Sequence, residues 1–140
     1  MNHKRVNDKI FIDVSKGDLI NKSLLEVATK ENLTSGWING LGAITNIEIG
    51  YYDIEDKVYV KKEFNEHYEL LSLMGNISLV DNKPFIHTHI SFSDTEFKVF
   101  GGHLFDARVI AAAEFCIFVS DYHLHRELNC NIGLSLWNIK

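Results

Sequence analysis

Only one segment of this 140-residue chain shows the spacing of apolar residues that is typical of an amphipathic helix. Ile20, Leu24, Val27 and Ala28 fall at i, i+4, i+7 and i+8 and would form one apolar stripe. The helix should end within residues 32–36, where Asn, Thr, Ser and Gly cluster. A chain with one helix must build most of its hydrophobic core from a β-sheet.

The other apolar residues follow strand patterns. In residues 69–80 apolar and polar side chains alternate, and a polar turn over 81–84 leads into a strand predicted from Phe85 to Phe92, so these two strands should pair antiparallel. Residues 109–119 are apolar on both faces and predict a buried central strand. Further strands are predicted over 10–14, 44–52, 58–63 and 132–139. The sequence therefore predicts a single α+β domain over residues 1–140, with a mainly antiparallel sheet and one principal helix.

Charge and composition exclude several classes of protein. The net charge of −5 and pI near 5.8 give no electrostatic footprint for nucleic acid. No 18 apolar residues run together, and Lys4 and Arg5 are not followed by the apolar region of a signal peptide. Cys116 and Cys130 lack metal-ligand or redox spacing. We expect them to be reduced core residues of a cytoplasmic protein.

Three histidines carry the most specific chemical signal. His87 and His89 are separated by one residue in a predicted strand, so both imidazoles would point to one face. His103 follows Gly101-Gly102, after enough chain to turn and return beside that strand. Three imidazoles with an open fourth position are typical of a catalytic zinc site. The alternative is that they are ordinary polar residues on a half-exposed strand, and the residues alone do not decide between the two.

A lone carboxylate is the second candidate. Glu114 sits between Ala113 and Phe115 in the apolar run, where an unpaired charge is costly to bury. It therefore lies near a sheet edge or has a cationic partner, and a metal or its bound water would be one such partner. A second His-x-His pair, His123 and His125, has no third ligand after it, and its charged neighbours favour a solvated turn.

The order of these signals resembles the plants-and-prokaryotes conserved domain, or PPC domain, in its stand-alone prokaryotic form. The resemblance covers nearly the whole chain. It rests on short motifs in the same order along the sequence: 25–28 with 36–43, 50–53, 68–77, 84–89, 101–104 and 113–114. The family implies a compact α+β domain, a mainly antiparallel sheet or open β-barrel with one principal helix, and assembly as a homotrimer. The fold is also similar to that of acetolactate decarboxylase, a zinc enzyme whose ligands include a His-x-His pair and a later histidine.

The resemblance leaves two function classes. The first is a homotrimeric metal-binding domain, with or without enzymatic activity on a small molecule, in which His87, His89 and His103 hold zinc or a similar divalent metal and Glu114 is a candidate catalytic acid/base. The second is a trimeric DNA-associated or regulatory interaction module without catalysis. Plant members of the family bind DNA through AT-hook segments, and the Arg-Gly-Arg-Pro of such a hook is absent from these 140 residues. We therefore expect specific DNA affinity to be weak or absent.

Overall fold

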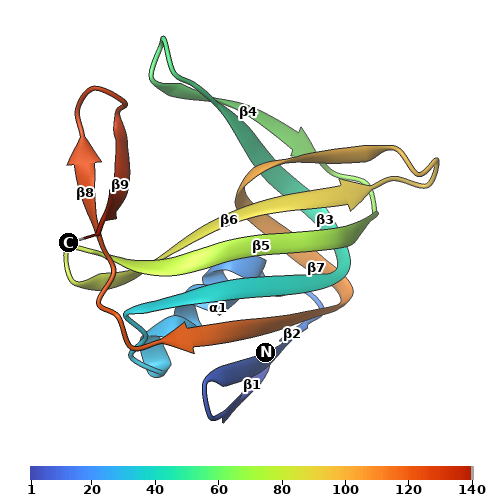
Figure 1. The fold of residues 1–140 in the computed structure, drawn as a ribbon. Helices are drawn as coiled ribbons and strands as arrows, with labels where there is room; N and C mark the ends of the chain where they lie inside the picture. Colours follow the sequence, from blue (N-terminus) through green and yellow to red (C-terminus); the bar gives the residue numbers. More distant parts are fainter. Residues whose placement is uncertain (140) are drawn as a thin grey trace.

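The computed structural model describes residues 1–139, which form nine strands and one helix. The elements are β1 (Asn2–Val6), β2 (Lys9–Ser15), α1 (Ile20–Lys30), β3 (Ser35–Asp53), β4 (Val58–Phe64), β5 (Tyr68–Val80), β6 (Lys83–Ser93), β7 (Val99–Ser120), β8 (His125–Asn129) and β9 (Leu134–Asn138). Figure 1 shows the long strands β3, β5, β6 and β7 as one curved sheet, with the hairpins β3–β4 and β8–β9 projecting from it. The predicted α+β class is confirmed.

The strand pairing produces an open, irregular barrel. β7 pairs with β2 and β3, β3 pairs with β4 and β5, and β5 pairs with β6, all antiparallel. β6 also pairs with the start of β7, and β7 pairs with β3. The strands β3, β5, β6 and β7 therefore form a closed circuit of paired strands. Among residues 1–139, only β8 joins in parallel, through the single pair of Leu79 and His125. The predicted pairing of the strands on either side of residues 81–84 is confirmed.

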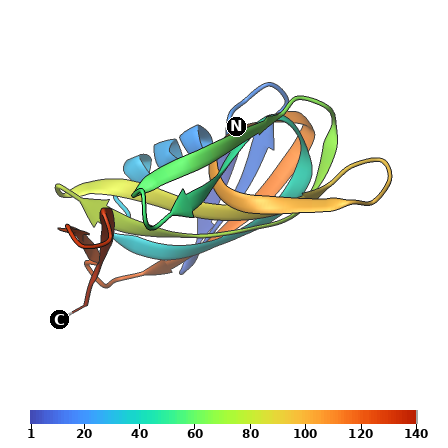
Figure 2. The same ribbon diagram turned by 90° about the horizontal axis from the view of Figure 1, so that it is seen from above.

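The helix packs against the sheet with the stripe expected from the sequence. Ile20, Leu24, Val27 and Ala28 are fully buried in a core that also contains the inward side chains of β2, β3, β5 and β7. Figure 2 shows α1 on one side of the sheet. The helix ends at Lys30, and Asn32 follows with a φ of 53°, a left-handed conformation that asparagine tolerates. One shared core makes the chain a single domain.

The opposite face of the sheet is uncovered, which corrects the prediction of a strand buried on both faces. β7 does lie centrally between β2 and β3, but Phe118 on its outward face is 41% exposed because α1 covers only the inner face. The cysteines also differ from expectation: both thiols are free, but Cys116 is half-buried and Cys130 is exposed in the β8–β9 turn. Within residues 1–139, α1 is too short and too polar to cross a bilayer, and no other helix is present.

Candidate metal centre

Strand geometry brings the three predicted histidines together. His87 and His89 project from the same face of β6, whereas Thr88 between them points into the protein and is 1% exposed. The chain turns after β6 and returns as β7, which places His103 directly across from His89. The glycine pair before His103 permits this approach: a Cβ on Gly101 would lie 2.5 Å from the carbonyl oxygen of Ile90 on β6.

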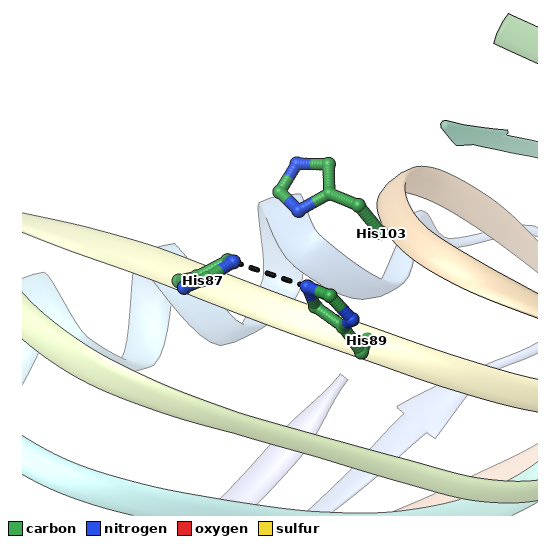
Figure 3. Close-up of side chains that lie close together, drawn as sticks. All are labelled: His87, His89 and His103. Carbon is green, nitrogen blue, oxygen red and sulfur yellow. Dashed lines mark hydrogen bonds between the residues drawn. The ribbon is translucent and has the colours of Figure 1, made fainter. Parts of the chain in front are cut away.

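The imidazoles converge on one small volume. Figure 3 shows His87 and His89 rising from β6 and a ring nitrogen of His103 directed at them from β7. The Nε2 atoms of His87 and His89 are 3.2 Å apart, and one candidate ligand atom from each of the three residues lies within 4.8 Å of the others. Nitrogens bound to one tetrahedral zinc ion at about 2.0–2.1 Å are about 3.4 Å apart. The pair already has this separation, and rotation of side-chain torsions can supply the remaining approach of His103.

Burial keeps these imidazoles neutral. Desolvation lowers the pKa of His87 to about 4, and the charges of Arg126, His103 and His89 contribute in the same direction. Desolvation, followed by the influence of His89, lowers the pKa of His103 to about 4, and burial also lowers the pKa of His89. A neutral imidazole keeps one ring nitrogen with a free lone pair, so none of the three rings has to lose a net proton to bind a metal at neutral pH.

One nitrogen of the cluster lacks a bonding partner that a metal ion would provide. The Nδ1 of His103 is buried and has no hydrogen-bond partner among the described residues. An unpaired buried polar atom costs free energy, and a metal ion would satisfy it. Three convergent neutral nitrogens, one of them orphaned, fit zinc or a similar borderline cation, which prefers imidazole ligands.

A hydrogen-bond network behind the sheet connects the two strands that carry the histidines. Pairing of β6 with β7 reaches His103 and stops there, so the next carbonyls of β7 lack partners on β6. Asn21 of α1 supplies hydrogen-bond donors for these carbonyls: its Nδ2 donates to the carbonyls of Leu104 and Phe105 at 3.1 and 3.0 Å. Its Oδ1 accepts the hydroxyl of Thr88 at 2.8 Å. One helical side chain therefore joins the backbone beside His103 to the residue between His87 and His89.

Side chains from both projecting hairpins surround the histidines. Tyr59 of β4 stacks on His103 with ring centroids 4.8 Å apart, and Phe105 meets the same imidazole edge to face at 5.1 Å. Burial raises the pKa of the Tyr59 hydroxyl. From the other side, Nη2 of Arg126 on β8 lies 3.3 Å from Nδ1 of His87. The site therefore has an aromatic wall at one end and a cation at the other.

Glu114 is not part of this cluster within one chain. It lies eleven residues beyond His103 on β7, a contour length of about 36 Å at 3.3 Å per residue. Its cross-strand neighbours are Asp13 and Leu41, and its side chain is exposed on the uncovered face. The second His-x-His pair does not join the group either: among residues 1–139 the only such cluster consists of His87, His89 and His103.

Sequence reasoning missed Asn21, Tyr59 and Arg126. Residues 121–127 were expected to form a solvated turn, but Leu124 is buried and Arg126 sits on a strand. No clear alternation marked that strand, because Leu128 is its only apolar residue and is 66% exposed. No local pattern could identify Asn21 or Tyr59, because each acts through contacts with strands that are distant in sequence.

Known proteins resemble this chain in sequence and in fold. The sequence model of the Plants and Prokaryotes Conserved (PCC) domain, the family also abbreviated PPC, matches residues 1–122. A search of curated proteins finds no match. A candidate DNA-binding protein of Bacteroides thetaiotaomicron is 28% identical, with a TM-score of 0.95 over 98% of this chain and 96% of that one.

Two archaeal structures are more similar in sequence. A PPC protein of Pyrococcus horikoshii is 33% identical, with a TM-score of 0.87 over 99% of this chain and 94% of that one. A metal-containing protein of Archaeoglobus fulgidus is 36% identical, with a TM-score of 0.86 over 96% of each chain. Acetolactate decarboxylase of Bacillus subtilis subspecies spizizenii is more distant: it is 13% identical, with a TM-score of 0.54 over 79% of this chain and 52% of that one, and shares only the fold. The chain belongs to the Plants and Prokaryotes Conserved domain family.

Proposed function

We propose that this protein is a metal-binding domain in which His87, His89 and His103 hold zinc or a similar divalent cation. The observation that carries the proposal is the convergence of three neutral imidazoles around the unpaired, buried Nδ1 of His103. The metal content of the Archaeoglobus fulgidus relative supports it, since that protein is 36% identical along almost the whole chain. When bound, such an ion polarises a carbonyl or activates a water molecule.

Elemental analysis of protein purified without chelators tests the proposal. We expect about one equivalent of zinc or a similar metal per chain, and reconstitution of stripped protein with zinc at neutral pH, where the imidazoles are neutral. Near-zero metal after reconstitution would leave the histidines as polar residues of the strands.

We also propose that the chain assembles as a homotrimer through its uncovered sheet face. Large apolar side chains from four neighbouring strands gather there, with exposed fractions between 41% and 54%: Phe11, Trp37, Leu41, Met74 and Phe118. They share one face because Trp37 lies opposite Phe118 and Phe11 lies opposite Cys116. A contiguous apolar patch of this kind is typical of an interface. Glu114 lies on the same face, so a catalytic role for it would depend on a neighbouring subunit.

Light scattering measures this assembly directly. A trimer has three times the mass of the 16.0 kDa chain, about 48 kDa. Replacing Trp37 and Phe118 with Ser should dissociate it, because both side chains are large and solvent-exposed in the single chain. A monomer of the unaltered protein at micromolar concentration would refute the proposal.

A DNA-associated interaction module is the second candidate, because the Bacteroides thetaiotaomicron relative is described as a candidate DNA-binding protein. The net charge of −5 opposes strong phosphate contact. We expect weak binding that disappears as salt rises, measured by fluorescence anisotropy with AT-rich duplex. Nanomolar affinity at physiological ionic strength would favour this second function.

A further inference from the structure

Arg126 is held rigidly beside the histidines. Its Nε donates to the hydroxyl of Ser78 at 2.7 Å, its Nη1 to the carbonyl of Ser135 at 2.8 Å, and its Nη2 to Oδ1 of Asn76 at 2.9 Å. The guanidinium also lies over the rings of Phe85 and Trp137, 5.3 and 5.9 Å from their centroids. These contacts from several strands fix the position of the cation.

The charge of Arg126 has no counter-ion in the described part of the chain. Every hydrogen-bond partner of the guanidinium is neutral, and none of the ion pairs in residues 1–139 includes it. Burial lowers the pKa of Arg126, as expected for an uncompensated cation. Half-buried charges are usually paired, so this position favours an anion from outside the chain.

The contact between Arg126 and His87 is suited only to the metal-free site. A guanidinium can only donate, so Nδ1 of His87 must accept, and the proton of the neutral ring is then on Nε2, facing His89. A metal ligated by Nε2 of His87 requires that proton to be on Nδ1 instead. Two donors, Nδ1–H of His87 and Nη2–H of Arg126, would then face each other without an acceptor.

A carboxylate resolves this conflict. Its oxygens accept from both donors and its charge balances Arg126, and metal-bound histidines commonly donate their second N–H to a carboxylate. Both side chains are half-buried, so a small molecule can reach them from solvent. A carboxylate has one oxygen for each of the two donors and one negative charge for the one positive charge of Arg126, whereas phosphate brings further oxygens and charge.

We propose that the protein binds a small organic carboxylate between Arg126 and His87, and that this carboxylate and the metal strengthen each other's binding. The inference rests on the proposed metal site. The carboxylate stabilises the protonation pattern of His87 that the metal requires. By thermodynamic reciprocity, the metal must then raise carboxylate affinity by the same factor.

Cobalt titration of the full chain with acetate as the probe measures this coupling. Saturating acetate should raise cobalt affinity by about tenfold, within the usual range of coupling between two sites. Acetate that merely competes for free cobalt in solution would lower the apparent affinity, so the direction of the change separates the two effects. Inorganic phosphate at equal ionic strength should produce a smaller increase.

Two substitutions locate the coupling. Arg126→Gln should abolish the acetate effect while cobalt still binds at about one equivalent per chain, and Arg126→Lys, which keeps the charge but loses the planar fork, should reduce it. Arg5→Gln, which removes a cation paired with Glu31 on the surface, should leave the effect unchanged. Circular dichroism verifies folding, and Arg126→Lys carries the test if the glutamine variant unfolds.

The failures are distinguishable. A protein that binds no cobalt overturns the metal site and this inference together. Cobalt binding that is unaffected by acetate, or an acetate effect that persists in Arg126→Gln, overturns the carboxylate site alone. A larger effect of phosphate than of acetate would show that the ligand class is wrong.

Discussion

The chain contains two His-x-His pairs, and only one belongs to a candidate metal site. His87 and His89 lie within β6, whose neighbour β7 returns alongside and supplies His103. His123 precedes β8 and His125 begins it, in a strand that meets β5 through a single residue pair. The spacing is identical in the two places. The difference shows that the spacing of two imidazoles does not make a site, and that a paired strand carrying a third donor does.

Removal of one imidazole from each pair should separate the two regions most strongly. His89→Ala deletes a predicted ligand and should lower zinc affinity by at least about 100-fold. His125→Ala removes a histidine outside the cluster and should leave zinc affinity unchanged. Competition with a chromogenic chelator measures both. Equal affinities in the two variants would remove the distinction between the pairs.

Loss of the Asn21 network should weaken metal binding by the first pair, His87 and His89. Asn21→Ala removes the two donations to β7 and the acceptor of Thr88, so His103 is no longer held in register with His87 and His89. We expect zinc affinity to fall by about tenfold, the lower range for residues that orient metal ligands. The visible spectrum of the cobalt form should change because the ligand geometry changes.

Val27→Ala is the matched control for that substitution. Val27 lies on the same helix and is fully buried, but it takes no part in the network. Its truncation should lower the free energy of unfolding by about 1–3 kcal/mol and leave cobalt binding and spectrum unchanged. If both variants lose metal affinity equally, general loss of stability would explain the Asn21 effect.

The sequence predicted the helix and the strands better than the contacts between residues that are distant in sequence. The stripe from Ile20 to Ala28 and the His87–His89 alternation follow local periods of 3.6 and 2, which backbone geometry fixes. The meeting of His103 with His89 was predictable because Gly101-Gly102 marks a close approach of strands. Arg126 and Tyr59 were not predictable, because their contacts depend on where two hairpins project from a curved sheet. The sequence suggested a functional role for Glu114 because its neighbours are apolar. Some of those apolar neighbours lie on the uncovered face of the sheet, so the apolar context does not mean that Glu114 is buried.

Acid should destabilise the metal-free protein through His87 and His103. His87 and His103 have pKa values of about 4 in the folded chain, whereas an unfolded histidine titrates near 6.5. The unfolded chain therefore takes up protons first, and the free energy of unfolding should fall as pH drops from about 6.5 towards 4. Urea unfolding at pH 7.5 and 5.0 measures this fall.

His103→Gln should reduce that pH dependence, since it removes one of the two strongly shifted groups. His125→Gln, which removes a histidine outside the cluster, serves as the control. Carboxylates that begin to titrate near pH 5 contribute equally to all three proteins, so the comparison isolates the histidines. An identical fall in His103→Gln would contradict the assignment of buried, neutral imidazoles.

The smallest effect is expected at Glu114, which tests whether the site of a single chain is complete. Glu114 lies directly opposite Asp13, and like charges in that position destabilise a sheet. Glu114→Gln should therefore raise the free energy of unfolding by about 0.2–1 kcal/mol, measured by urea unfolding, and leave zinc affinity unchanged. A loss of zinc affinity that appears only at concentrations where light scattering detects the trimer would mean that a neighbouring subunit brings its carboxylate to the histidines. The acid/base role predicted from the sequence would then belong to the assembly, and the difference between the two His-x-His pairs would depend on subunit contacts as well as on strand pairing.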